Sequence, residues 1–320
     1  MLVRGEGKRY GKKYIYDRED VLIIFEVKRK LSSQSLYEGW RHLSDITREC
    51  TKDFIRKVDL EDYEPDMTVV GYYFGAFFKK MPPKKYKDIF NYNKKESMLL
   101  FSFLQDSDLP LRILHTFEGY ANEVNFRKAY LDVFESFFNG CEGWRVGLPN
   151  IPNLVTTGNY AAVKGTGQPH FVRDEEALFA VVSLEGNIAE VLIETIWMKI
   201  SRFIGVLMPW GEDQQLEKIS PLVKCWPREE DDHAGWEYRL LNERAINESS
   251  NVMWEPEVLT DFVDSFLNLL YTYEGVDIDG EEFMAICDGY GISKASGLEE
   301  VLSTDLFALD DGAIYPIIII

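Results

Sequence analysis

Residues 17–43 read DREDVLIIFEVKRKLSSQSLYEGWRHL, and the first half of this stretch decides the fold that the sequence predicts. The apolar run Val21–Phe25 is rich in Ile, which is typical of a buried strand. Because side chains alternate along a strand, Glu26 and Lys28 share one face, and we expect Val27 to point toward the core. The stretch therefore predicts a buried strand that ends in a neighbouring acid and base.

A helix is predicted to follow that strand. Ser32 or Ser33 can cap it, and apolar residues from Leu36 to Phe54 recur at spacings of three and four, which is typical of an amphipathic helix. Further segments are expected to be strands at Val69–Phe78 and Leu111–His115, a helix at Phe126–Phe138, strands and turns at Leu148–His170, and an interrupted helix at Glu175–Ile204. Strands mixed with helices in this order predict an α/β domain with a mixed sheet.

Charge is divided unevenly along the chain. The 320 residues carry a net charge of −19, which argues against a protein that binds nucleic acid over its whole surface. Lys and Arg nevertheless outnumber Asp and Glu within residues 1–100, whereas the remainder is strongly acidic. Because phosphate attraction acts within a Debye length of about 8–10 Å, a basic N-terminal third can still bind DNA locally.

The sequence has no targeting or membrane signal that we recognise. No stretch reaches the ~18 uninterrupted apolar residues of a membrane span, and the opening MLVRGEGKRY contains no apolar leader segment. The four cysteines are far apart and form no close pair typical of a zinc site. We therefore expect a soluble cytoplasmic protein without membrane contact.

Glu26 and Lys28 are the candidate catalytic residues. A carboxylate beside a lysine on a buried strand suits phosphodiester hydrolysis. Glu26 can hold Mg²⁺ or Mn²⁺, and the main-chain carbonyl of Val27 can add a ligand. Lys28 can orient the attacking water and stabilise charge on the phosphate. The alternative is an ordinary salt bridge at the end of a strand.

A family resemblance enters at these residues. The run 17–43 resembles the core of the PD-(D/E)XK, restriction-endonuclease-like nucleases. LPNIPNLVTTGNYAAVKGTGQPHF (148–171) and IETIWMKISRFIG (193–205) are similar to a prokaryotic family of restriction-endonuclease-like proteins of unknown function. The resemblance covers residues 1–225 and is specific at Glu-Val-Lys. It implies a mixed sheet with flanking helices, DNA as the substrate, and Glu26 and Lys28 at the motif positions.

One departure from the family pattern separates two hypotheses. Such folds need a first metal-binding aspartate on the preceding strand, but here that strand is MLVR, at the first residues of the chain. Asp17 and Asp20 fall in the polar turn, where we expect them to be turn or salt-bridge residues. The chain is then either a metal-dependent nuclease whose acid lies in an upstream segment, or a catalytically degenerate relative that binds nucleic acid or serves as a regulatory or scaffold protein. A second carboxylate beside Glu26 would favour the first hypothesis.

A basic and aromatic hairpin is the second candidate site. It contains Lys8, Arg9, Lys12 and Lys13, interleaved with Tyr10 and Tyr14. Since cations hold phosphates and aromatic rings stack on bases, we predict that this hairpin binds nucleic acid on the approach to Glu26. A solvated hairpin tip is the alternative, and the same two interpretations apply to the lysines within residues 79–87.

The C-terminal part predicts a separate domain. Residues 226–254 are expected to be an acidic linker. Residues 255–320 show three helical patterns followed by a hairpin that turns at Asp310-Asp311-Gly312, which is the order of a winged helix. Lys294 is the only basic residue in this range, so we expect a homo-oligomer or protein contact there rather than DNA reading.

Overall fold

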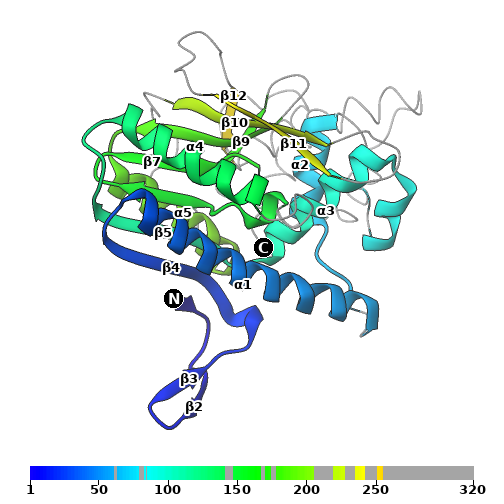
Figure 1. The fold of residues 1–320 in the computed structure, drawn as a ribbon. Coiled ribbons are helices and arrows are strands. Elements are labelled where there is room, and N and C mark those ends of the chain that lie inside the picture. Colours follow the sequence, from blue (N-terminus) through cyan, green and yellow to red (C-terminus); the bar gives the residue numbers. More distant parts are fainter. Residues whose placement is uncertain are drawn as a thin grey trace, which may run out of the picture.

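The Ile-rich run forms β4 (Val21–Lys30), which pairs in parallel with β5 (Leu111–Glu118) in the computed structural model of the chain. The structure describes residues 1–60, 63–78, 83, 85–140, 147–166, 170–173, 178–204, 219–227, 235–241 and 251–254. Within these ranges the chain is an α/β protein built on a large mixed sheet (Figure 1). The winged helix expected at 255–320 lies outside the described residues.

Ten strands of the described residues form this sheet. Eight of them follow the order β1 (Leu2–Val3), β4, β5, β6 (Leu154–Thr157), β7 (Tyr160–Lys164), β9 (Leu178–Glu185), β10 (Ile219–Pro227) and β11 (Trp236–Leu240). The short strand β8 (His170–Arg173) pairs with β9 and with β12 (Asn251–Trp254). β4, β5 and β6 are parallel neighbours, and the other pairings are antiparallel, so the sheet is mixed as expected.

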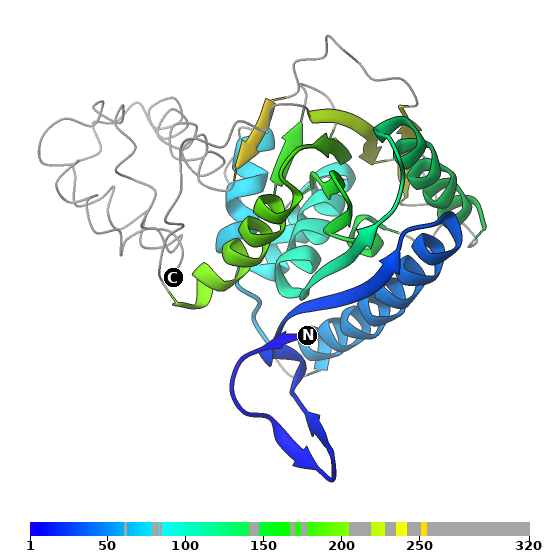
Figure 2. The same ribbon diagram turned by 90° about the vertical axis from the view of Figure 1, so that its left-hand side faces the viewer.

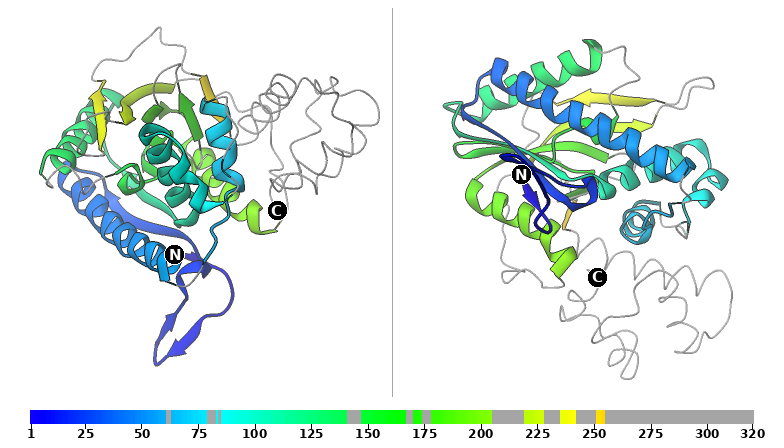
Figure 3. Two further views of the ribbon diagram at one scale, coloured as in Figure 1. Left: turned by 90° about the vertical axis from the view of Figure 1, so that its right-hand side faces the viewer. Right: turned by 90° about the horizontal axis from the view of Figure 1, so that it is seen from below.

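Helices cover both faces of the sheet. They are α1 (Ser33–Leu60), α2 (Thr68–Phe78), α3 (Lys94–Asp108), α4 (Glu123–Gly140) and α5 (Ile188–Ile204), together with the short 3-10 helices η1 (Arg18–Asp20), η2 (Tyr86–Asn91) and η3 (Leu148–Asn150). Side chains of α1 to α4 form one hydrophobic core, whereas α5 packs on the opposite face over β4, β5 and β6. Figure 3 (right) shows α1 and α4 on one side of the sheet and α5 on the other. None of the helices in the described ranges combines the length and the hydropathy needed to cross a membrane.

Trp40 and Gly39 fix the position of α1 above the parallel strands. The Trp40 ring is fully buried against Tyr130, Phe134 and Phe137, and its Nε1 donates to the carbonyl of Asn150 at 2.9 Å. A Cβ atom at Gly39 would come within 2.3 Å of Leu114 Cδ1, so only glycine permits this close approach. The predicted helix is therefore confirmed and held tightly over β4 and β5.

Two sequence interpretations were wrong about element type. Val69–Phe78 was expected to be a strand but lies within α2, whose buried Val70, Tyr73 and Phe74 recur at helical spacing and join the core of α1 to α4. The expected helix at Glu175–Ile204 is split among its described residues, because Leu178–Glu185 forms β9 and the helix α5 begins at Ile188. Both errors concern apolar runs, in which buried strands and buried helices look alike.

The sheet also extends beyond residue 225, where a linker was expected. β11 pairs antiparallel with β10 from Val223↔Leu240 to Pro227↔Trp236, and β12 pairs with β8. Trp236, Tyr238 and Leu240 pack against the core, while Glu237 and Arg239 alternate with them. This period of two indicates a strand, and the acidic residues around it led the sequence analysis to a linker.

Candidate functional site

Glu26 and Lys28 lie side by side on β4, on the face that α1 covers. Lys28 Nζ is 2.7 Å from Glu26 Oε1, and the two side chains are 29% and 23% exposed. Strand alternation places them together, and their partial exposure leaves the pair within reach of a ligand. The contact fits both a catalytic pair and an ordinary salt bridge.

His42 of α1 completes this group, and the sequence analysis missed it. Its Nδ1 lies 3.6 Å from Glu26 Oε1, and the imidazole is 52% exposed. A Cβ atom at Gly39, one helical turn earlier, would stand 3.3 Å from Glu26 Cγ, so α1 passes directly over the carboxylate. The sequence contained one sign of this contact: His42 is a polar residue one turn after Gly39, in a helix that was predicted to pack on this strand.

Asp17 and Asp20 do not join Glu26. Asp20 pairs with Arg4 at 3.6 Å, and Asp17 lies 3.9 Å from Lys8. Both acids precede β4, whereas Glu26 lies five residues into the strand, about 16 Å along it at ~3.3 Å per residue. Across the described part of the chain, no three His, Cys, Asp or Glu side chains gather into a group that could hold a metal ion.

Val27 differs from its expected orientation. Its side chain is 53% exposed, although Ile23, on the same strand, is fully buried beneath α5. The exposed Phe117 lies near it on β5, and His115, the register partner of Val27, hydrogen-bonds through Nδ1 to Thr156 Oγ1 at 2.7 Å. Burial lowers the pKa of His115. The face that α5 covers is therefore left open at the carboxyl ends of β4 and β5.

The four basic residues of the hairpin lie together but apart from Glu26. β2 (Lys8–Tyr10) and β3 (Lys13–Ile15) form a two-stranded ribbon whose residues are all exposed. The ribbon leads into the start of β4 and projects away from the rest of the described structure (Figure 2). Of the second lysine cluster, Lys85 and Lys87 are exposed, and Lys79, Lys80 and Lys84 lie outside the described residues.

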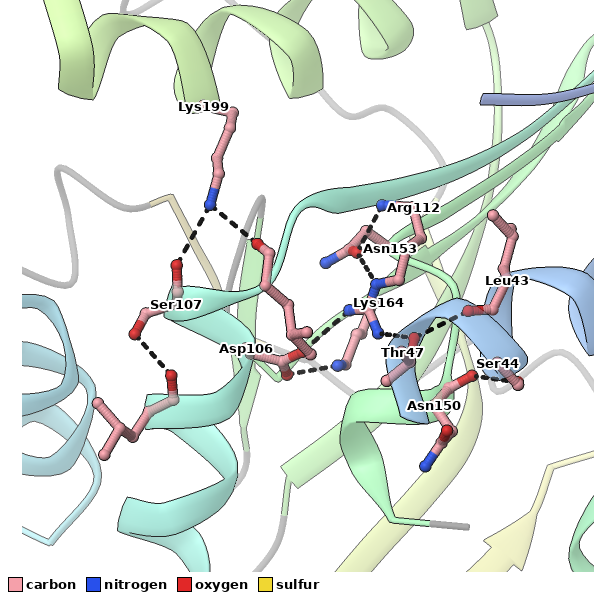
Figure 4. Close-up of polar contacts among 12 residues, drawn as sticks. Leu43, Ser44, Thr47, Asp106, Ser107, Arg112, Asn150, Asn153, Lys164 and Lys199 are labelled. Carbon is pink, nitrogen blue, oxygen red and sulfur yellow. Dashed lines mark hydrogen bonds and ion pairs between the residues drawn. The ribbon is translucent and has the colours of Figure 1, made fainter. Parts of the chain in front are cut away.

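A buried polar cluster is the other group that the sequence analysis missed (Figure 4). Asp106 of α3 accepts from Arg112 Nη2 at 3.0 Å and from Lys164 Nζ. Arg112 also donates through Nη1 to Thr47 Oγ1 and through Nε to Asn153 Oδ1, each at 3.1 Å. Burial lowers the pKa of Lys164 to about 8, although Asp106 opposes this shift. The cluster joins α1, α3, β5 and β7 and is closed to solvent.

Comparisons with protein-family models, with curated proteins and with solved structures found no match for this chain. The resemblance to restriction-endonuclease-like nucleases therefore stays a prediction, carried by the residues at Glu26 and by the strand and helix around them.

Proposed function

We propose that this chain is a restriction-endonuclease-like protein that hydrolyses phosphodiester bonds of DNA with Mg²⁺ or Mn²⁺. The supporting observation is the 2.7 Å contact between Lys28 Nζ and Glu26 Oε1 at a half-exposed position beneath α1. In this proposal Glu26 is the carboxylate ligand, the carbonyl of Val27 adds an oxygen, and Lys28 faces the phosphate. DNA is the expected partner, with further contacts from the hairpin cations.

The donor set at Glu26 fits a divalent cation in part. Mg²⁺ keeps several waters and is bound through one or two carboxylates together with substrate phosphates. Glu26 supplies one carboxylate, whereas His42 offers an imidazole, a ligand that suits transition metals better than Mg²⁺. When bound, the ion would lower the pKa of a coordinated water and neutralise charge on the phosphate.

The protein groups have distinct tasks in this proposal. The half-exposed ammonium of Lys28 can contact Glu26 and a phosphate oxygen at once, because each of its three N–H groups is a donor. α1 passes close over the Glu26 side chain at Gly39, and Lys28 remains 29% exposed, so a ligand would approach from the Lys28 side. Orienting groups held in this way stabilise charge that develops on the phosphate.

A catalytically degenerate, DNA-binding or regulatory protein is the second candidate. Among the described residues, the side chains that form ion-pair contacts with Glu26 are Lys28 and His42, and neither is a carboxylate. In that case the Glu26–Lys28 pair only stabilises the end of β4, and the hairpin is the part of the protein that binds nucleic acid. A protein or homo-oligomer contact through the acidic C-terminal part belongs to this second candidate as well.

Plasmid cleavage with Mg²⁺ or Mn²⁺ distinguishes the two candidates. Glu26→Gln and Lys28→Met should each abolish nicking while DNA binding in EDTA remains within a few-fold of the parent protein. Glu118→Gln is the matched control, because Glu118 is an exposed carboxylate at the end of the neighbouring strand. Cleavage that survives Glu26→Gln would exclude this site, and DNA binding without any cleavage by the parent would favour the degenerate protein.

A further inference from the structure

The hairpin β2–β3 has an unusual concentration of positive charge for an acidic protein. Residues 7–16 read GKRYGKKYIY, with four cations and no acid, in a chain of net charge −19. Tyr10 and Tyr14 are 76% and 56% exposed, and no residue of either strand is buried. A two-stranded ribbon is at best marginally stable alone, so an exposed ribbon of this composition is consistent with a surface that a partner covers.

Both faces of the ribbon carry cations. The pairs Lys8↔Ile15 and Tyr10↔Lys13 lie on one face, because paired residues of adjacent strands point to the same side and alternate positions share it. The pair Arg9↔Tyr14 lies on the other face. A flat partner surface would contact only one of these faces, whereas a groove with two anionic walls contacts both.

The ribbon is held in a defined shape. Gly11 (φ 63°) opens the two-residue turn, and its carbonyl accepts from Arg9 Nε at 3.1 Å. Gly7 (φ 66°) packs against the ring of Tyr16 at the other end of the ribbon. At the base of the ribbon, where it joins the sheet, the main-chain N–H of Arg4 donates to the main-chain carbonyl of Asp20 at 2.7 Å. These contacts offset the marginal stability of an isolated ribbon, so the hairpin loses less conformational freedom on binding than an unanchored one would.

We propose that β2–β3 enters the major groove of duplex DNA as a two-stranded ribbon. The major groove is about 12 Å wide and about 8.5 Å deep and admits a two-stranded β-ribbon. Each strand of the hairpin has three residues, which at ~3.3 Å per residue gives a length of about 10 Å and so matches the groove depth. Phosphates on both walls then face the cations on both faces of the ribbon.

This inference rests on the proposed function in taking DNA as the partner, and it adds that the DNA is double-stranded. The ribbon precedes β4, and Glu26 lies a further ~16 Å along that strand from its first residue, Val21, at ~3.3 Å per residue. Binding by the ribbon and cleavage at Glu26 are therefore separable, and each can fail without the other.

The test is fluorescence anisotropy in EDTA with a duplex of about two helical turns, ~20 base pairs, and with one of its single strands. The first variant replaces Lys8, Arg9, Lys12 and Lys13 by Gln. Two further variants neutralise the strand cations of one face each, Lys8→Gln with Lys13→Gln, and Arg9→Gln alone. The matched control removes four exposed cations of α1 and α4 by Arg48→Gln, Lys52→Gln, Arg56→Gln and Lys128→Gln.

The expected result is a loss of duplex affinity that depends on salt. Each lost phosphate contact lowers the log–log salt slope by about 0.9 on duplex DNA, so the fourfold variant should lose about 3.6 units and on the order of a thousandfold in affinity near 0.1 M salt. Since both walls are contacted, the Lys8 and Lys13 variant should lose about half of that slope and the Arg9 variant about a quarter. The control should keep the parent slope.

Several results would overturn the inference. They are no duplex binding by the parent protein, an unchanged slope in the fourfold variant, or an effect confined to one face. Equal hairpin-dependent binding of the single strand would point to stacking on unpaired bases instead. Two further experiments test other partners. One measures binding to vesicles of phosphatidylserine and phosphatidylcholine, and the other measures self-association of the protein alone by sedimentation. Hairpin-dependent binding to vesicles or self-association, without duplex binding, would assign the ribbon to a membrane surface or to the acidic surface of a second copy.

Discussion

Two of the lysine–carboxylate contacts among the described residues differ sharply in their surroundings. Lys28 and Glu26 are 29% and 23% exposed on β4, whereas Lys164 and Asp106 are 0% and 4% exposed between β7 and α3. The exposed pair has a free path to solvent, while the buried pair is closed in by Arg112, Thr47 and Asn153. The same two functional groups therefore suit a ligand site in one place and a structural cross-link in the other.

Energetics separate the two pairs further. A partly exposed ion pair contributes about 0–1 kcal/mol to stability, because water screens the attraction and two side chains must be ordered. Removing one partner of a buried pair costs about 3–5 kcal/mol, since the remaining charge stays in a poorly solvated place. The comparison predicts that the buried cluster governs the free energy of unfolding, whereas the exposed pair does not.

Asp106→Asn should produce the largest change. It leaves Arg112 and Lys164 as two buried cations without a counter-charge, so we expect a loss of about 3–5 kcal/mol in the free energy of unfolding. Urea denaturation measures the loss. Asp132→Asn, which removes an exposed carboxylate paired with Lys128 on α4, is the control and should change stability by less than about 0.5 kcal/mol. Equal effects of the two variants would contradict the comparison.

Gly39→Ala should have the next largest effect. The new Cβ would stand 2.3 Å from Leu114 Cδ1, and Leu114 is fully buried, so α1 or β5 must shift. We expect a destabilisation of about 1–2 kcal/mol, because overpacking outweighs the gain in helix propensity. Thermal unfolding measures it. Arg41→Ala, at an exposed position of the same helix, is the matched control and should change stability little. An increase in stability would show that α1 is not held as closely over Glu26 as described.

Lys164→Met should change the pH dependence of stability. The folded-state pKa of Lys164 is about 8, below the ordinary value of 10.5, because burial disfavours the charged ammonium. Between these two values the unfolded chain binds more protons than the folded one, so this group makes stability rise with pH in that window. The free energy of unfolding of the parent, relative to that of the variant, should therefore increase between pH 8 and pH 10. Urea titrations at several pH values test this, and a constant difference would contradict it.

Lys28→Met should have the smallest effect on stability. We expect a change below about 1 kcal/mol, because the pair with Glu26 is partly exposed. Under the proposed function the same substitution removes DNA cleavage. Measuring both quantities on one preparation separates a site from a structural contact. A loss of several kcal/mol would place Lys28 with the buried cluster instead.

Local patterns were enough to predict the elements around Glu26. The Ile-rich run of β4, the apolar spacing of α1 and the polar hairpin each depend on neighbours in sequence, and the structure contains all three. The contact between Glu26 and Lys28 follows from strand alternation alone. By contrast, His42 reaches Glu26 only because Trp40 and Gly39 set the height of α1 over the sheet.

The buried cluster could not be predicted in the same way. Asp106, Arg112 and Lys164 come from a helix end and two strands, and each alone resembles an ordinary charged residue at the end of an element. Lys164 ends the apolar strand β7, where a lysine normally reaches solvent. Only the packing of α3 beside β7 shows that all three face one another. Such contacts depend on tertiary structure and leave no local period in the sequence.

The order of β4 and β5 in the chain has a consequence for synthesis on the ribosome. Ile23 pairs with Leu111, so β4 must wait until α1, α2 and α3 have been made before its parallel partner arrives. Until then this Ile-rich, β-prone segment can pair only with the two residues of β1, and its other edge is open, which exposes a nascent chain to aggregation. The charged residues that follow it, Lys28, Arg29 and Lys30, are gatekeepers of the kind that oppose such association. Replacing them with apolar residues should therefore lower the soluble yield during expression, even if the folded protein were unchanged.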